Sequence, residues 1–293
     1  MEGYIQALID GLMIGGVYAM AAVGLSLAFG VMRIINWAHG QILMVGMTIA
    51  YVLISKSTIN PFVLACVAGI FLFVFGYLLQ KLIFNHMLAK DTAREPQSVM
   101  TFTLGLGMVL TNLVQILMGA TPMLARHAFS GKTIMLGDYY IISITKLVSF
   151  LMAVFLCGAL YVFLQKSETG RAIRSISQNR FTARLMGIDV ENIYCISFGV
   201  ALGLTGVAGG LLSTYMATYP TVGDVFSFRA FVIVVLGGKG SVAGALVGGL
   251  IIGIIEKVGG LFMTDSYAQL ITFLIFIGFL LFKPSGLFGK ETA

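Results

Sequence analysis

Long apolar stretches without a charged side chain recur along the chain, and short polar segments separate them. A helix needs about 20 predominantly apolar residues to cross the roughly 30 Å of hydrocarbon in a bilayer. The charge-free windows are 11–32, 40–55, 61–80, 96–125, 147–165, 193–223, 230–238, 240–255 and 266–282. This pattern predicts an all-α, polytopic transmembrane helical bundle. It has eight or nine crossings, depending on whether 230–238 crosses the membrane or enters it as a half-helix.

Lysine and arginine are concentrated in two of the polar segments, 81–95 and 166–192. Cytoplasmic loops of membrane proteins carry an excess of these residues, so both segments are predicted to be cytoplasmic. The first ten residues contain Glu2 and Asp10 but no basic residue, which favours an external N-terminus. Counting spans from the basic segments puts the C-terminal end in the cytoplasm. A chain whose two ends lie on opposite sides of the membrane crosses it an odd number of times, so nine crossings are favoured. Eight crossings require one helix to enter the membrane and return to the same side.

The composition supports a membrane protein and excludes a soluble one. Of the 293 residues, 58% are hydrophobic and only 10% are charged, whereas a soluble domain carries about 25% charged residues. No polar segment between the windows is long enough for a second domain, so residues 1–293 are predicted to form a single transmembrane domain. The net charge of +6 is expected from cytoplasmic loops rather than from binding of nucleic acid.

Motifs for catalysis are missing from the sequence. The segment GGKGS at 237–241 is not a phosphate-binding loop, because that motif requires glycine where Ile233 stands and Ser or Thr where Gly240 stands. No paired histidines at metal-ligand spacing, no G-x-S-x-G motif and no carboxylate cluster are present. The chain is therefore predicted to be no enzyme, with no metal site and no cofactor of its own.

A polar segment interrupts the apolar pattern between the first two windows. Free backbone groups cost several kcal/mol each in hydrocarbon, so a break in a helix persists only where protein buries it or where it lines a watery cavity. Discontinuous helices at transporter binding sites are one such use. The alternative is a short cytoplasmic turn anchored at the interface by Arg33 and Trp37. The candidate substrate-pathway residues in this segment are Asn36, His39 and Gln41.

Glycine is frequent, and many of the 36 glycines have helical spacing. Gly240, Gly244 and Gly248 form a ladder with four-residue spacing. Small residues four apart make a flat groove in which another helix backbone can approach closely. The ladder predicts a helix that packs tightly on one face or that lines a narrow path with its backbone.

Three ionisable residues lie at the edges of the late windows: Arg229, Glu256 and Lys257. Charged groups inside a membrane are expensive and are usually paired or functional. Because Glu256 and Lys257 are adjacent, they point about 100° apart on a helix, and they are interpreted as the end of that helix.

Five segments in order resemble motifs of the permease subunits of branched-chain amino acid ATP-binding-cassette importers, the LivH type. They cover nearly the whole chain, which makes the resemblance specific to the family and less specific to the substrate. The segments are GLSLAFGVMRIINWAHGQILMVG (24–46), TFTLGLGMVLTNLVQILMG (101–119), TGRAIRSISQNRFTARLMGID (169–189), VIVVLGGKGSVAGALVGG (232–249) and KPSGLFG (283–289).

The resemblance implies a mechanism and a set of partners. This chain and a sister permease would form the translocation path in the bacterial cytoplasmic (inner) membrane. Two ATPase subunits would bind the ATP, and a periplasmic or lipid-anchored binding protein would deliver leucine, isoleucine or valine. The loop 166–192 would dock on the ATPase, presenting a small apolar face with arginines beside it. The residues assigned to this docking are Gly170, Arg171, Ala172, Arg174, Ala183, Gly187 and Asp189.

Two other transport functions remain open at this point. A related permease for urea or short-chain amides would share these motifs. An ion-coupled secondary transporter would normally carry intramembrane carboxylates, for which Glu256 is the only and weak candidate. A structural membrane scaffold explains neither the polar break nor the glycine ladder.

Overall fold

The structure is a computed structural model, and it describes residues 2–90, 97–136, 140–262, 265–283 and 286–288. The predicted cytoplasmic segment 81–95 is only partly covered, since 91–96 lie outside the described residues. The elements are α1 (Glu2–Met32), α2 (His39–Lys56), α3 (Pro61–Leu79), the π-helical turn η1 (Gln80–Phe84), α4 (Asn85–Lys90), α5 (Gln97–Met118), β1 (Thr133–Leu136), β2 (Tyr140–Ser143), α6 (Ile144–Lys166), α7 (Glu168–Gln178), α8 (Arg180–Leu185), α9 (Val190–Ser213), α10 (Val222–Gly237), α11 (Val242–Gly259) and α12 (Asp265–Phe282).

The chain is mostly helical, as the apolar windows predict. Among the described residues, six helices are long and apolar enough to cross a membrane: α1, α3 continued to Leu88, α5, α6, α9 and α11. The prediction of an all-α fold is wrong at one place. Strands β1 and β2 pair antiparallel, from Thr133 opposite Ser143 to Leu136 opposite Tyr140. They lie between apolar windows and are rich in β-branched residues, which favour strands.

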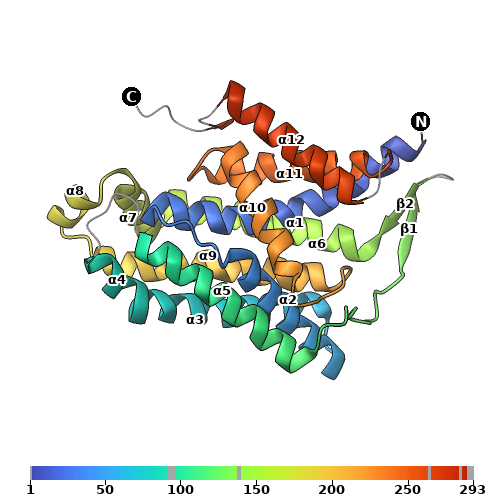
Figure 1. Cartoon of the computed structure of the whole chain (residues 1–293), viewed down its shortest axis with the longest axis horizontal. Helices are drawn as coiled ribbons and strands as arrows, with labels where there is room; N and C mark the ends of the chain where they lie inside the picture. Colours follow the sequence, from blue (N-terminus) through green and yellow to red (C-terminus); the bar gives the residue numbers. More distant parts are fainter. Residues whose placement is uncertain (1, 91–96, 137–139, 263–264, 284–285, 289–293) are drawn as a thin grey trace.

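Helices α1 and α9 form the centre of the bundle, and α2, α3, α6, α10 and α11 pack around them (Figure 1). In the most apolar stretch of α1, 89% of the residues are buried inside the protein. Helix α11 lies against α1 with almost no side chain between them. A Cβ atom added to Gly253 would lie 2.4 Å from the Cα atom of Gly15, and one added to Gly249 would lie 2.4 Å from the Cα atom of Ala19. Glycine therefore sets the spacing of the two central backbones.

The glycine ladder serves packing. A Cβ atom on Gly244 would lie 2.0 Å from the carbonyl oxygen of Gly237 in α10, and one on Gly248 would lie 2.9 Å from that of Ile233. Gly240 is outside the helix: it lies in the turn before α11, with a φ of 81° that suits glycine. The alternative, a backbone-lined path along this face, is wrong because α10 covers it.

The two ends of the bundle differ in structure (Figure 1). One end, the hairpin end, carries the N-terminus and the β1–β2 hairpin. The side chain of Gln6 in α1 pairs with the backbone of Ile141 in β2 at 2.8 and 3.1 Å, which holds the hairpin on α1. Asp10 of α1 forms an ion pair with Lys146 of α6 at 2.6 Å beside it. The opposite end, the α8 end, carries α4, α7 and α8.

An ion pair joins α10 to α11 inside the bundle. Arg229 binds Glu256, and their side chains are only 13% and 16% exposed. The guanidinium also lies 5.1 Å from the ring centroid of Tyr18 in α1. The interpretation of Glu256 and Lys257 as the end of a helix is confirmed, since α11 ends at Gly259; in addition, Glu256 pairs with a cation on a neighbouring helix.

Candidate functional site

The break predicted between the first two helices is present, and it returns the chain into the bundle. Helix α1 ends at Met32, and Arg33 has a positive φ of 55°, which turns the backbone. The next residues run back along α1, so that His39, the first residue of α2, reaches the carbonyl oxygen of Ala21 at 2.9 Å. Helix α2 therefore begins part-way along the bundle and not at its surface.

Two of the three predicted pathway residues hold this break in place. His39 is buried, donates to Ala21 and lies 3.4 Å from the hydroxyl of Thr205 in α9. Asn36 is also buried, and its side-chain oxygen accepts from the amide of Ala38 at 3.1 Å. Both satisfy polar groups inside the protein, as a buried break requires. Asn36 and His39 therefore anchor the break, and their assignment to the substrate path stays a prediction.

Gln41, the third predicted residue, faces a different set of partners. Its amide nitrogen donates to the carboxylate of Asp224 at 2.7 Å, and its oxygen accepts from the hydroxyl of Ser227 at 3.2 Å. Ser227 in turn accepts from the amide of Gly40 at 3.0 Å. We call Gln41, Asp224 and Ser227 the polar junction. It marks the point where the first turns of α2 and α10 meet.

Sequence reasoning missed Asp224 and Ser227, because both lie between the apolar windows 193–223 and 230–238. In the structure, Thr218 pairs with Met123, and α10 then begins directly beside α2. A Cβ atom on Gly223 would lie 2.9 Å from the Cα atom of Gln41. The signal available in the sequence was the short 230–238 window, preceded by an acidic residue at a position typical of a helix start.

The junction opens onto an exposed face with apolar walls. Trp37 is exposed and stacks on Phe231 of α10, with ring centroids 6.4 Å apart. On the other side, Gly107 of α5 lies against Gln41. We call the surface formed by α5, residues 37–41 and α10 the open face.

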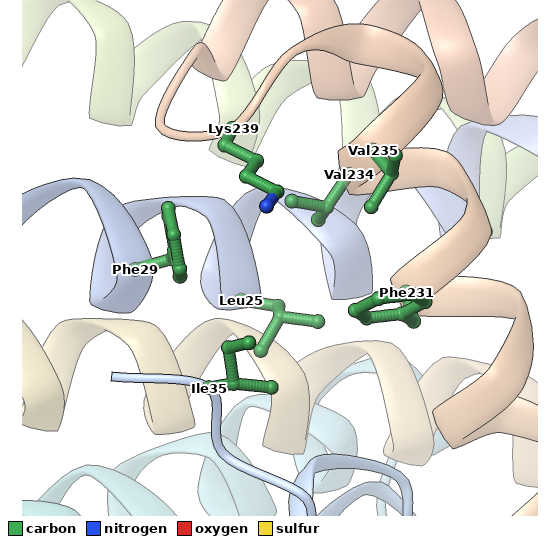
Figure 2. A pocket seen from close by; sticks show the side chains of 7 residues that line it. All are labelled: Leu25, Phe29, Ile35, Phe231, Val234, Val235 and Lys239. Atoms are coloured by element: carbon green, nitrogen blue, oxygen red, sulfur yellow. The ribbon is translucent and has the colours of Figure 1, made fainter. Parts of the chain in front are cut away.

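A small hollow lies beside Phe231, between α1, the break, α10 and the turn between α10 and α11 (Figure 2). Apolar side chains from α1, the break and α10 form its walls, and the ammonium of Lys239 lies 5.6 Å from the ring centroid of Phe29. The lining of the hollow thus combines one ammonium group with apolar walls. The lining residues are Leu25, Phe29, Ile35, Phe231, Val234, Val235 and Lys239.

The predicted docking segment forms α7 and α8, but its apolar face points inward. Ile173, Ile176 and Ala183 are buried against the rest of the chain. A Cβ atom on Gly170 would lie 2.4 Å from the carbonyl oxygen of Phe163, so this glycine seats α7 on α6. Ile173, Ile176 and Ala183 therefore serve packing within the chain, Ala172 at their edge is half-buried, and docking of this segment on an ATPase stays a prediction.

A different apolar group is exposed on α8. Phe181, Leu185 and Met186 are 69%, 72% and 78% exposed. Gly187 follows α8 with a φ of 81°, a conformation that favours glycine. The backbone conformation at the end of the helix therefore explains why glycine stands there. Asp189 caps α9 by accepting from the amide of Asn192 at 3.1 Å.

The predicted docking arginines have partners within the chain. Arg171 lies 3.7 Å from Glu168, and Arg174 donates to Gln165. In the described part of the chain no three His, Cys, Asp or Glu side chains gather in a way that could hold a metal ion.

Comparison with known proteins decides the family. A family model described as the permease component of the branched-chain amino acid transport system matches residues 7–280. The chain belongs to this permease family. With its apolar helices, the permease is therefore a multi-pass protein of the inner membrane and a component of a transport system.

Several relatives match the permease over nearly its full length. It is 30% identical to the high-affinity branched-chain amino acid transport permease BraD of Pseudomonas aeruginosa, over 98% of this chain and 96% of that one. It is 26% identical to LivH of Escherichia coli over the same shares of the two chains. A ribose import permease of Haemophilus influenzae is 31% identical over 46% of this chain and 44% of its own. No solved structure matches the permease significantly.

Proposed function

We propose that the permease is the membrane-embedded subunit of an ATP-binding-cassette importer that carries leucine, isoleucine and valine. The family supports the class of transport system, and one structural observation carries the assignment of the path. At the polar junction two helices begin inside the bundle and leave a carboxylate and an amide on an otherwise apolar open face. In a membrane protein such irregular backbone is tolerated where protein buries it or where it lines a cavity.

The chemistry of the junction suits a zwitterion with an apolar side chain. The carboxylate of Asp224 would accept hydrogen bonds from the substrate ammonium group. The positive ends of the α2 and α10 dipoles would favour the substrate carboxylate. Trp37 and Phe231 would contact the apolar side chain. No dense array of charges holds the substrate, which suits a path that must release what a separate binding protein has already selected.

We further propose that a single transmembrane domain, residues 1–293, crosses the membrane nine times, through α1, α2, α3, α5, α6, α9, α10, α11 and α12. Support comes from helix directions: Gly30 of α1 lies against Gly240 before α11, and Gly11 lies against Ile254 near the other end, so these helices run antiparallel. The hairpin end is then external, and the α8 end is cytoplasmic.

Energy and selection would come from partner proteins. Because the sequence lacks a phosphate-binding loop, we propose that two ATPase subunits bind the ATP and dock at the α8 end through Phe181, Leu185 and Met186. A sister permease would complete the path. A periplasmic or lipid-anchored binding protein would deliver the amino acid at the hairpin end.

Uptake of labelled leucine by cells expressing the complete transporter tests this function. Asp224→Asn removes the charge that would hold the ammonium group. Loss of a charge-assisted hydrogen bond weakens binding by about tenfold or more. We expect leucine uptake to fall by that factor with unchanged amounts of permease in the membrane. Glu191→Gln is the control, since that carboxylate is exposed near α8 and far from the junction.

Three outcomes would reject the proposal. Unchanged uptake by Asp224→Asn would remove the junction from the path. Uptake of labelled urea in place of leucine would reassign the substrate. Solute accumulation by the purified permease alone on an ion gradient would contradict an ATP-driven importer.

A further inference from the structure

Helix α5 is attached to the bundle along one side only. In its most apolar stretch 22% of the residues are buried, against 89% in α1. The buried residues are Val99, Thr103, Gly107 and Val114, which face α2 and the break. Figure 1 shows α5 on the near side of the bundle, beside α2. The rest of its surface is open.

The side of α5 that points away from the bundle is polar along its middle. Thr101, Gly105, Met108, Asn112 and Gln115 are all exposed. At about 100° per residue they fall within an arc of about 80°, opposite the buried residues. We call these five residues the α5 stripe.

The α5 stripe is not what a helix in contact with lipid should present. On α6 the corresponding outward positions are apolar, as hydrocarbon requires, and include Leu151, Phe155 and Val162. On α5, two carboxamides lie where lipid tails would be. Unsatisfied polar groups are costly in hydrocarbon.

The hydrogen-bonding capacity of the α5 stripe is largely unused. The Asn112 side chain donates once, to the carbonyl of Met108 at 2.8 Å. The Gln115 side chain makes no hydrogen bond to the described part of the chain. A Cβ atom on Gly105 would meet nothing within 4 Å, so another backbone can approach there. Polar side chains beside a small residue are typical of contacts between membrane helices.

We propose that a transmembrane helix of a second permease subunit covers the α5 stripe. The occupant would present amide or hydroxyl side chains at the depth of Asn112 and Gln115, and would pack closely over Gly105. The inference rests on the proposed function, in which two permease subunits form the path. Helix α5 would then lie between the second subunit and Gln41, which contacts the opposite side of α5 at Gly107.

Apolar neighbours argue against the alternative that the α5 stripe lines water. Val109, Leu113 and Ile116 flank it and are exposed. A narrow polar strip with an apolar border matches a contact between helices, where amides bond across the interface and the border packs.

Photo-crosslinking in membranes from cells that express the whole transporter tests the contact. A benzophenone amino acid is incorporated at Met108, which is 69% exposed, and as a control at Phe155 on α6, which is 72% exposed. We expect an adduct of this chain with a second permease subunit from position 108 and none from position 155. Only lipid adducts at both positions, or an adduct of position 108 with any other protein, would overturn the proposal.

A second variant tests the chemistry of the contact. Asn112→Leu combined with Gln115→Leu makes the stripe apolar, which a lipid-facing helix tolerates. We expect co-purification of the second permease subunit to fall about tenfold, because two interhelical hydrogen-bonding groups are lost. Val154→Leu with Val162→Leu on α6 is the matched control. Undiminished co-purification of the Asn112/Gln115 variant would overturn the proposal.

These readouts do not depend on transport. A crosslink from position 108 in a transporter that fails to carry leucine would leave the contact standing and reject the substrate. Leucine uptake without that crosslink would reject the contact and leave the proposed function.

Discussion

At the scale of single residues, the Arg229–Glu256 pair is the clearest source of local stability. Both side chains lie inside the bundle, and the guanidinium also contacts the rings of Tyr18 and Phe226. Breaking such a pair leaves an uncompensated charge, which costs about 3–5 kcal/mol. We expect Arg229→Leu to lower the melting temperature of the purified permease markedly. Thermal unfolding followed by size-exclusion chromatography in detergent measures it.

The double variant Arg229→Leu with Glu256→Leu distinguishes the pair from simple packing. Replacing a buried ion pair by apolar residues of similar volume is often neutral, so we expect most of the stability to return. A double variant that is less stable than Arg229→Leu would show that Glu256 has a role apart from its partner.

At the scale of helices, the contact between α10 and α11 depends on the absence of side chains. Any Cβ atom on Gly244 would overlap the carbonyl oxygen of Gly237. We expect Gly244→Val to destabilise the permease by about 1–3 kcal/mol or more through overpacking, seen as reduced amounts in the membrane. Gly158→Val on α6 is the matched control, because a Cβ atom there meets nothing within 4 Å. Equal effects of the two substitutions would contradict the packing explanation.

The exposed surface of α8 gives a second prediction at this scale. Leu185→Glu places a charge in the exposed apolar group proposed to dock on the ATPase. We expect co-purification of the ATPase subunits and leucine uptake to fall at least about tenfold, with normal insertion of the permease. Gln178→Glu adds the same charge at the exposed end of α7 and should have little effect. Normal co-purification of Leu185→Glu would place the docking surface elsewhere.

The long helices could be predicted from the sequence because each apolar window is itself the physical requirement for crossing hydrocarbon. The starting points of α2 and α10 could not be predicted from the sequence. They depend on contacts between residues far apart in the chain, such as Gly40 with Ser227 and His39 with Ala21. The pairing of Arg229 with Glu256 is equally invisible, because periodicity does not show which helices are neighbours.

The candidate site was predicted only in part, because its geometry also depends on contacts between residues far apart in the chain. The polar character of the break identified Asn36, His39 and Gln41, but polarity alone does not tell an anchor from an exposed group. His39 turned inward to satisfy a carbonyl, and Gln41 turned toward α10. For the docking segment, the sequence could not show that the bundle itself covers Ile173, Ile176 and Ala183.

At the scale of the whole molecule, the number of crossings depends on α10. This helix has 16 residues, and at 1.5 Å per residue it spans about 24 Å, less than the roughly 30 Å of hydrocarbon. In the nine-crossing arrangement, residues 214–221 descend to the polar junction and α10 completes the passage. In the eight-crossing arrangement, α10 dips and returns, so every later segment changes sides.

Labelling of single cysteines with a membrane-impermeant maleimide in intact cells separates the two arrangements. The three native cysteines are replaced first, and cysteine is introduced at Ile59, Lys239 or Phe262, each of which is exposed in a connection between helices. Nine crossings put positions 59 and 262 outside and position 239 inside, because the turn at 239–240 lies against the cytoplasmic end of α1 at Gly30. We therefore expect the maleimide to label positions 59 and 262 in intact cells and to label position 239 only after the membrane has been permeabilised. Labelling at 239 and protection at 262 would mean that α10 is re-entrant. The substrate would then have access to the open face only from outside the cell.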